Sequence, residues 1–198
     1  MKTVCCLDLE GILVPEIWIH VAKKTQIDAL KLTTRDISDY DKLMRYRLRI
    51  LKQKGIKLQH IQKIIRGMKP LAGARAFLRR LQARMPVMIL SDTYYEFAGP
   101  LLDQLGNPVL FCNWLKVNHS GTITGYVLRQ KDGKRKAVNA LKQMGFYVKA
   151  AGDSYNDVTM LKEAHAGVLF NPPPNIRKSF KQFPVARNYK RLLRLLSG

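Results

Sequence analysis

Hydrophobic and polar positions follow two different periods along this chain. In its second part, short apolar runs alternate with segments whose apolar residues recur at helical spacing. The apolar runs predict strands at residues 4–7, 87–90, 109–112, 148–151 and 166–170. Strict alternation of strands and helices indicates a parallel sheet with helices on both faces, which is a Rossmann-like α/β core.

The segments between these strands have the pattern of helices. The predicted helices lie at residues 74–83, 95–105, 133–144, 156–164 and 189–196. One connection differs, because an N-H-S-G turn separates two extended stretches within residues 114–128, and this predicts a β-hairpin. The three prolines at 172–174 predict a rigid loop.

Residues 15–71 contain no strand signal. Apolar residues recur at helical spacing from Ile17, and further helices are predicted at residues 40–54 and 58–65. Several residues can cap the helix at 40–54, among them Thr34, Ser38 and Asp39. The block is therefore predicted to be an all-helical insertion in the α/β core.

The composition is that of an ordinary globular protein. Of the 198 residues, 46% are hydrophobic and 25% are charged. No apolar run approaches the ~20 residues that a membrane helix needs, and Asp8 precedes any signal-like segment. The three cysteines include no C-x-x-C pair and are predicted to be reduced, structural thiols. We expect a cytoplasmic protein that does not bind a membrane.

The net charge of +21 is unusual. Residues 42–91 contain 14 Lys and Arg residues and no acid, and residues 164–198 contain seven more with no acid. Such charge attracts anions, so it suits either a nucleic acid or a small phosphorylated substrate. It is equally compatible with solvated helix faces that have no specific partner.

Polar residues follow several of the predicted strands. Three strand ends carry them, at residues 8–10, 91–93 and 152–154. In open parallel sheets the ligand site lies beyond the carboxyl ends of the strands, so these tripeptides are expected to meet. Their acids and hydroxyls suit a hard cation and a phosphate. The alternative from the first tripeptide alone is that Asp8 caps a helix and Glu10 is solvated.

The same residues resemble a known family. The D-L-E-G, I-L-S-D-T and A-A-G-D-S-Y-N-D segments, with Lys134 opening a helix, resemble the four ordered motifs of haloacid dehalogenase-type phosphatases. Residues 15–71 lie where phosphoserine phosphatases carry a small helical cap. The segments L-D-L-E-G-I-L-V-P-E-I-W, R-L-R-I-L and L-R-Q-K-D resemble the bifunctional phosphoserine phosphatase/homoserine phosphotransferase family.

The resemblance implies a domain division and a catalytic centre. The core would comprise residues 1–14 and 72–198, and the all-helical cap residues 15–71. Asp8 would be the nucleophile that forms an aspartyl-phosphate. Mg²⁺ would be held by Asp8, the backbone carbonyl of Glu10 and Asp153.

The remaining roles concern charge and protons. Lys134 would supply a second positive charge, and Glu10 would be the general acid and then the base. Asp157 would orient Lys134 or a water on the metal. Most of the superfamily has Asp at the position of Glu10, and the longer side chain could make room for homoserine beside the phosphoaspartate.

The resemblance also implies the substrate contacts. Ser91, the backbone N–H of Asp92 and Asn156 would bind the phosphate. Glu16 would pair with the substrate ammonium and Arg49 with its carboxylate. The predicted substrate is phosphoserine, with water or homoserine as acceptor.

One alternative belongs to a different class. The net charge of +21 also suits a basic nucleic-acid-binding protein, or a nucleic-acid-end phosphatase on the same scaffold. Pure binding is disfavoured, because a protein that only grips a phosphate backbone has no need of Asp8, Glu10 and Asp153 in a metal-binding arrangement. A homodimer is also possible.

Overall fold

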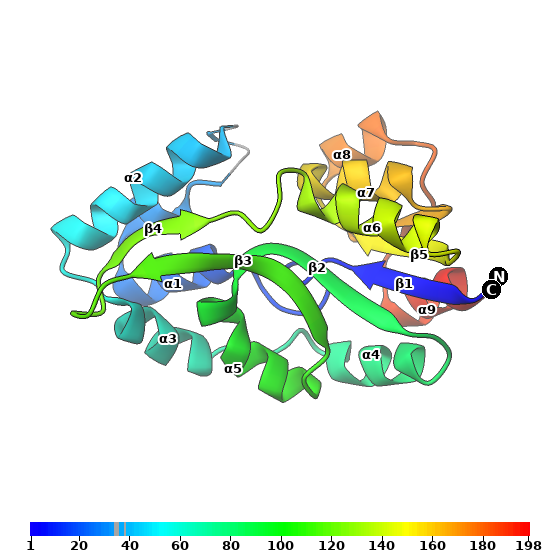
Figure 1. The fold of residues 1–198 in the computed structure, drawn as a ribbon, viewed down its shortest axis with the longest axis horizontal. Coiled ribbons are helices and arrows are strands. Elements are labelled where there is room, and N and C mark those ends of the chain that lie inside the picture. Colours follow the sequence, from blue (N-terminus) through cyan, green and yellow to red (C-terminus); the bar gives the residue numbers. More distant parts are fainter. Residues whose placement is uncertain (34–35, 38) are drawn as a thin grey trace.

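The computed structural model describes residues 1–33, 36–37 and 39–198. Within them, seven strands form one sheet in the order β4-β3-β2-β1-β5-β6-β7, with β1 at its centre (Figure 1). Every pairing is parallel except the antiparallel hairpin of β3 and β4. The strands are β1 (Thr3–Leu7), β2 (Val87–Tyr94), β3 (Val109–Val117), β4 (Ile123–Val127), β5 (Tyr147–Gly152), β6 (Ala166–Phe170) and β7 (Val185–Ala186).

Helices cover both faces of the sheet (Figure 1). One face carries α4 (Ala74–Gln82), α5 (Tyr95–Leu105) and α9 (Tyr189–Ser197), and the other carries α6 (Gly133–Gln143), α7 (Val158–Glu163) and α8 (Pro174–Ser179). Successive residues of a strand point to opposite faces. Cys5 and Leu7 of β1 accordingly belong to one buried cluster, and Val4 and Cys6 to another. The predicted α/β fold is confirmed.

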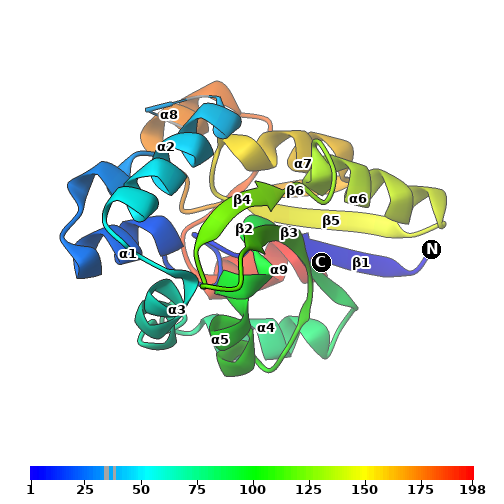
Figure 2. The ribbon, with the colours of Figure 1, turned by 60° about the vertical axis from the view of Figure 1, so that its left-hand side comes forward.

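The helical block precedes α4. It comprises α1 (Ile17–Thr25), the 3₁₀ helix η1 (Asp28–Lys31), α2 (Tyr40–Gln53) and α3 (Leu58–Arg66), shown in Figure 2. The side chain of Asp39 caps α2 by accepting hydrogen bonds from two backbone N–H groups. Thr34 and Ser38, the other cap candidates, lie outside the described residues.

The block packs closely on the rest of the molecule. Tyr40 of α2 meets Tyr126 of β4 edge to face, with ring centroids 5.8 Å apart. Ile17 and Ile61 share one buried apolar cluster with Phe97 of α5. The division into a core domain and a cap domain therefore stays a prediction, since the apolar cluster is continuous across the boundary.

Some element boundaries differ from those expected. Strand β2 continues through residues 91–93 to Tyr94, with a shift of its pairing with β3 after Leu90. The 3₁₀ helix η2 (Tyr155–Asp157) precedes α7, which begins only at Val158. Pro174 is the first residue of α8 instead of part of a loop, because its fixed φ suits the first turn of a helix. The two-residue strand β7 was not predicted.

Two further sequence predictions concerned the cysteines and membrane-spanning helices. Cys5, Cys6 and Cys112 are buried and free of disulfides. Among the described residues, the longest apolar helices fall short of what is needed to cross a bilayer.

Candidate active site

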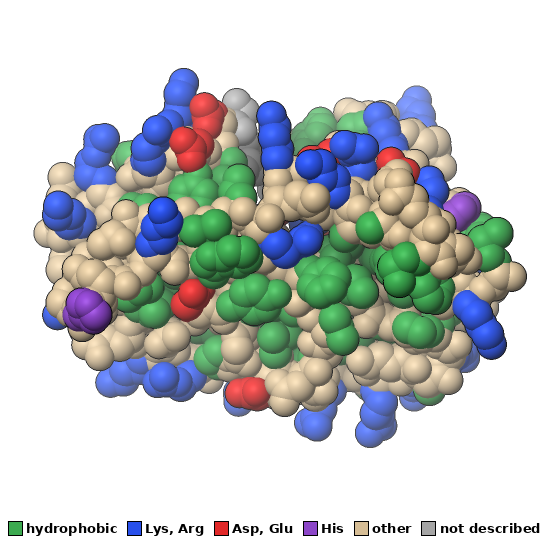
Figure 3. All heavy atoms as spheres, viewed as in Figure 1, with side chains coloured by type: hydrophobic (Ala, Val, Ile, Leu, Met, Phe, Trp, Pro, Cys, Tyr) green, Lys and Arg blue, Asp and Glu red, His purple; other side chains and the backbone are tan. Residues whose placement is uncertain are grey.

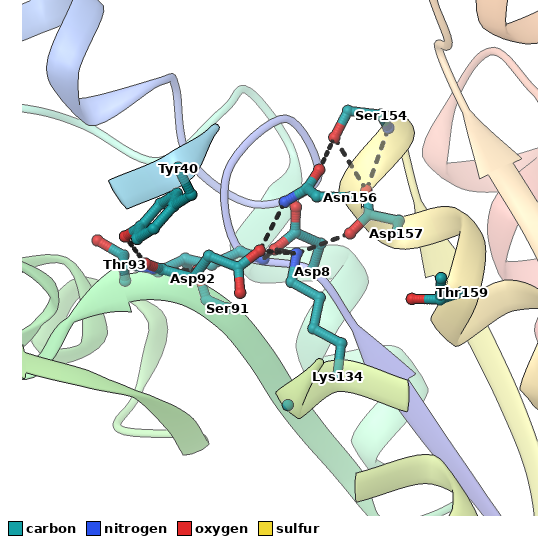
Figure 4. A network of polar contacts seen from close by, with 12 residues as sticks. Asp8, Tyr40, Ser91, Asp92, Thr93, Lys134, Ser154, Asn156, Asp157 and Thr159 are labelled. Atoms are coloured by element: carbon teal, nitrogen blue, oxygen red, sulfur yellow. Dashed lines mark hydrogen bonds and ion pairs between the residues drawn. The ribbon is translucent and has the colours of Figure 1, made fainter. Parts of the chain in front are cut away.

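The carboxyl ends of β1, β2 and β5 meet beside the helical block, as Figure 4 shows from close by. They line a cavity of about 210 Å³. Of the residues predicted for the site, those that line it are Asp8, Glu10, Glu16, Ser91, Asp92, Lys134, Asp153 and Asn156. The expectation that separate polar strand ends gather in one crevice is therefore met.

Asp8 lies at the tip of the central strand. Its backbone N–H donates to the carbonyl oxygen of Ala151 on β5 at 3.0 Å, and its Oδ1 accepts the N–H of Leu9 at 2.8 Å. The tight turn that follows places Gly11 against Asp153. A Cβ on Gly11 would lie 2.5 Å from the Asp153 carboxylate, and φ is +75° there. Only glycine fits both demands, so this turn brings Asp153 close to Asp8.

Lys134, at the start of α6, is buried among carboxylates with 4% of its side chain exposed. Its Nζ lies 2.8 Å from Asp8, 2.7 Å from Asp157 and 3.7 Å from Asp92. These carboxylates hold the pKa of Lys134 well above its usual value, against the effect of burial. Lys134 is therefore a fixed positive charge in contact with Asp8.

For the Asp8 carboxyl, in contrast to Lys134, the surroundings favour the neutral form. Burial and the nearby Asp157 raise its pKa well above the usual value, although Lys134 acts to lower it. Negative charge exceeds positive charge around Asp8, since Asp153 and Asp157 each offer an oxygen within 4.8 Å of it, whereas Lys134 is the cation in contact with it. A further cation would stabilise the ionised form of Asp8.

Asp157 organises the loop that follows β5. It is fully buried, and its Oδ2 accepts the backbone N–H groups of Asp153 at 2.9 Å and Ser154 at 3.1 Å. Its Oδ1 accepts from Lys134. A Cβ on Gly152 would lie 2.3 Å from the Cβ of Asp157, so glycine is needed for this approach. Asp157 thus orients both Lys134 and the Asp153 loop.

The acidic cluster fits a hard divalent cation. Asp8, Asp153 and Asp157 each offer an oxygen within 4.8 Å of the others. Both oxygens of Asp157 accept hydrogen bonds, one from Lys134 and the other from the backbone N–H of Asp153, so Asp157 also holds the loop in place beside the cluster. An all-oxygen donor set with excess negative charge is typical of Mg²⁺ sites. Two of the predicted metal ligands, the carboxylates of Asp8 and Asp153, therefore lie together, and their chemistry fits a hard divalent cation.

Glu10 stands on the wall of the cavity that faces the helical block. Its Oε2 accepts the backbone N–H of Ile17, the first residue of α1, at 2.8 Å. Burial and the negative charge of Glu16 raise the pKa of Glu10 to about 8. The raised pKa favours the protonated form of Glu10, which can donate a proton within the cavity.

The end of β2 offers the polar groups expected around a phosphate. Ser91 is buried, and its Oγ accepts the N–H of Thr93 at 3.3 Å. The side-chain amide of Asn156 donates to Oδ2 of Asp92 at 2.8 Å. These residues and Lys134 present hydroxyl, amide and ammonium donors to one side of the cavity.

The backbone of Asp92 is held from the opposite side. Its carbonyl oxygen accepts from the hydroxyl of Tyr40 at 3.2 Å and from the side chain of Asn113 at 3.1 Å. The hydroxyls of Tyr40 and Tyr94 lie 2.7 Å apart. Helix α2 is thereby tied to the strand end that carries Ser91.

The structure does not bring Arg49 into the cavity. Arg49 is exposed and borders a separate pocket with Lys52 and Ile123. Arg47 lines the active-site cavity in its place, with 6% exposure, and its guanidinium lies 4.5 Å from the ring centre of Trp18. The reason is helical period, because residues two apart lie on nearly opposite sides of a helix.

Arg47 retains capacity to bind an anion. Its Nη2 donates to the carbonyl oxygen of Leu32 at 2.7 Å. Its buried Nε has no hydrogen-bond partner among the described residues. A buried unsatisfied donor beside a cavity is a natural contact for a ligand carboxylate.

Sequence reasoning missed Arg47 and Tyr40. A signal for Arg47 was present, since it lies in register with the buried Leu43, Met44 and Leu51 of α2. A cation on an apolar stripe is unusual enough to mark a candidate site. No local pattern indicates that Tyr40 contacts Asp92, because 52 positions separate them in sequence.

Comparisons with known proteins agree with this geometry. The haloacid dehalogenase-like hydrolase family matches residues 11–165. Phosphoserine phosphatase ThrH of Pseudomonas aeruginosa is 57% identical over 191 residues, which cover 96% of this chain and 93% of the relative. A phosphoserine phosphatase of Pseudomonas syringae pv. tomato is 53% identical over 189 residues, which cover 96% of this chain and 80% of that relative.

Solved structures agree on the fold. A phospho-aspartyl intermediate analogue of phosphoserine phosphatase superposes with a TM-score of 0.81 at 20% identity, covering 98% of this chain and 99% of that one. A phosphoserine phosphatase in apo form gives a TM-score of 0.80 at 20% identity, with 98% of both chains covered. The chain therefore belongs to the haloacid dehalogenase-like hydrolase family, and within it to the phosphoserine phosphatases that include ThrH.

Proposed function

We propose that this enzyme is a Mg²⁺-dependent phosphoserine phosphatase that works through an aspartyl-phosphate on Asp8, and that homoserine can replace water as the acceptor. The observation that carries the proposal is the contact of buried Asp8 with Lys134, in a cavity that Arg47 and Glu16 also line. The relatives at 57% and 53% identity are named phosphoserine phosphatases, which supports the choice of substrate.

In the first step, Asp8 attacks phosphorus and the serine oxygen departs, so that the phosphoryl group passes to the carboxylate. Lys134 balances negative charge on the transferred group, and Ser91 and Asn156 donate hydrogen bonds to its oxygens. When bound by Asp8, Asp153 and the Glu10 carbonyl, Mg²⁺ would neutralise further charge on the phosphate.

Glu10 supplies and removes the proton. Its raised pKa, about 8, favours the protonated form, so it can protonate the departing serine oxygen. Glu10 is then ionised and can accept the proton of the water or homoserine whose oxygen bonds to phosphorus, while the bond from phosphorus to Asp8 breaks and the free carboxylate returns. The hydrogen bond from the N–H of Ile17 holds this carboxyl at the cavity wall throughout.

The amino-acid part of the substrate would bind on the side of the helical block. We assign its carboxylate to Arg47, whose buried Nε lacks a partner among the described residues, in place of the predicted Arg49. We assign its ammonium to Glu16, which precedes α1 and lines the same cavity. Both contacts select a small zwitterionic phosphomonoester.

The choice of acceptor would depend on the space beside the phosphoaspartate. Glu10 reaches further than an Asp would at this position, and its carboxyl is drawn towards Ile17 of α1. We expect the Glu10→Asp variant to shift the product ratio away from phosphohomoserine and towards free phosphate. An unchanged ratio would contradict this role for Glu10.

The proposed activity is tested by a screen for phosphate release over small phosphomonoesters. Purified enzyme with Mg²⁺ is assayed with and without homoserine, and the Asp8→Asn variant is the blank. The proposal expects phosphoserine to be the preferred substrate and phosphohomoserine to form when homoserine is present. A preference for nucleotides or for nucleic-acid ends would overturn the substrate assignment.

We also infer where the enzyme works in the cell. Because small phosphorylated amino acids are intermediates of cytoplasmic metabolism, we infer that the enzyme works in the cytoplasm. The possible homodimer stays a prediction.

A further inference from the structure

The catalytic proposal accounts for the buried charges and leaves the exposed ones without a role. Two segments without acids, residues 42–91 and 164–198, contribute helices α4 and α9, which pack against each other. We call their shared outer surface the α4–α9 face. Its exposed cations are Arg75, Arg79, Arg80, Arg84, Lys190, Arg191 and Arg194.

Specific contacts hold the two helices together. The rings of Phe77 in α4 and Tyr189 in α9 stack with centroids 4.9 Å apart. Arg84, just after α4, donates from Nη1 to the Oγ of Ser197 in α9 at 2.5 Å. The face is therefore built by tertiary packing of segments that lie about a hundred residues apart in the sequence.

On each helix the cations occupy the side opposite the buried residues. Arg75 and Arg79 are one turn apart on α4, whose buried side carries Phe77 and Leu78. On α9, Lys190 and Arg194 are likewise one turn apart. Figure 3 shows Lys and Arg side chains projecting along the lower edge of the molecule, below α3 and α4.

Most exposed Lys and Arg residues in the described part of the chain, including those of the α4–α9 face, form no ion pair with an acid. Arg45, Arg135 and Lys142 each form an ion pair with Asp or Glu. Among the described residues, none of the cations of the α4–α9 face does so. Like charges on adjacent helices repel one another, and a polyanion laid across both helices would relieve that repulsion.

From this juxtaposition we propose that the α4–α9 face binds the phosphate backbone of double-stranded nucleic acid without sequence preference. The Cβ atoms of residues one helical turn apart lie about 6 Å from each other, so their long, flexible side chains can reach neighbouring phosphates of one strand. Counterion release then provides the free energy of binding.

The side chains of this face argue against other polyanions. Its helices contribute none of the exposed large hydrophobic residues among the described positions, so it has nothing to insert into a bilayer. Tyr189 is held in the stack with Phe77, so no exposed ring is available on α4 or α9 to stack on unpaired bases. A duplex presents its phosphates along the outside and keeps its bases paired and stacked inside, which matches this composition.

Binding at this face is separate from catalysis. No residue of α4 or α9 lines the active-site cavity. Duplex binding at this face therefore does not depend on the phosphatase activity. Retained phosphatase activity then shows that a variant of the face is folded.

The test measures binding of the full chain to a random-sequence, fluorescently labelled DNA duplex at several salt concentrations. For the unmodified protein we expect a slope of log K against log salt of about −4 to −6, with binding still measurable near 0.15 M salt. The variant Arg75→Gln/Arg79→Gln/Arg80→Gln should bind at least about tenfold more weakly, with a slope shallower by about 2 to 3.

A matched control removes the same charge from the other face of the sheet. Lys136→Gln/Arg177→Gln/Lys178→Gln changes three exposed cations of α6 and α8. We expect it to lose less than about threefold in affinity. Equal losses in both variants would overturn the proposal, because binding would then follow net charge alone.

Two further outcomes would also overturn it. One is the absence of measurable duplex binding near 0.15 M salt. The other is binding to vesicles of phosphatidylglycerol and phosphatidylcholine that matches duplex binding and is lost in the α4–α9 variant, which would assign the face to a lipid surface.

Discussion

The active-site cavity and the α4–α9 face differ in the burial and the pairing of their charged side chains. In the cavity, the buried carboxylates of Asp8 and Asp157 and the partly exposed carboxylate of Asp92 surround the buried ammonium group of Lys134. On the α4–α9 face, cations stand in solvent without an acidic partner among the described residues. The net charge of +21 is that of the whole chain and describes neither region.

The difference shows how burial changes the free-energy cost of a charged side chain. A buried ion is unfavourable unless it is paired, so the fold has to place carboxylates against the ammonium group of Lys134. An exposed cation costs little, so its presence is not required by the fold. Buried charge therefore points to chemistry inside the protein, whereas exposed charge points to partners in solution.

The largest expected effect comes from breaking the buried network. Lys134→Met would leave Asp8 and Asp157 buried without their cation, and should lower the free energy of unfolding by about 3 to 5 kcal/mol. Phosphoserine turnover should fall by more than about a thousandfold, because a positive charge beside the phosphoryl group is lost. Urea unfolding and a phosphate-release assay measure the two effects.

A second substitution separates stability from catalysis. In Lys134→Met/Asp157→Asn, one of the unpaired carboxylates is neutralised, so part of the lost stability should return while activity stays low. Full recovery of activity in the double variant would mean that Lys134 serves only to neutralise Asp157.

Gly11→Ala should have a smaller effect that is confined to the site. The new Cβ would meet the Asp153 carboxylate at 2.5 Å and displace it. We expect the apparent affinity for Mg²⁺ to fall by about 10- to 100-fold, measured from the Mg²⁺ dependence of the rate.

Gly145→Ala is the control, since Gly145 has a similar φ of +84° and nothing within 4 Å of the added Cβ. It should share only the cost in stability of a positive φ, about 1 to 2 kcal/mol. Equal Mg²⁺ dependence in the two variants would show that the position of Asp153 does not matter.

Two of the arginines of α2, Arg47 and Arg49, provide a matched pair. Arg47→Lys should raise KM for phosphoserine by about tenfold, because an ammonium group cannot reproduce the two-pronged contact of a guanidinium. Arg49→Lys should leave KM unchanged, since Arg49 lies outside the cavity. The reverse result would restore the original assignment to Arg49.

The smallest effect is expected at the surface. The Arg75→Gln/Arg79→Gln/Arg80→Gln variant should keep kcat/KM for phosphoserine within about twofold, because these side chains are exposed and distant from the cavity. A large loss of activity would mean that the α4–α9 face and the active site are coupled.

The sequence was most informative where an apolar run ended in charged residues. Asp8, Asp92 and Asp153 could be grouped because parallel strands carry their ends to one edge of a sheet. The helical block was recognised from its apolar spacing and its lack of strand signals. Both predictions rest on patterns that are visible within short stretches of the sequence.

Other features depended on contacts that no local pattern reveals. Arg49 was predicted from the resemblance, and Arg47 was missed although it lies on the buried stripe of α2. The link of Tyr40 to Asp92 depends on how α2 packs on the sheet end. Strand β7 has two residues, too few to show a period.

The central claim is that Asp8 accepts the phosphoryl group. The most direct measurement is rapid acid quenching of the enzyme during turnover of phosphoserine with Mg²⁺, followed by peptide mass spectrometry. We predict a phosphoryl adduct on Asp8 that decays faster when homoserine is added and is absent from the Asp8→Asn variant. Turnover by the unmodified enzyme without any adduct on Asp8, or phosphoserine hydrolysis by Asp8→Asn at a comparable rate, would contradict the account.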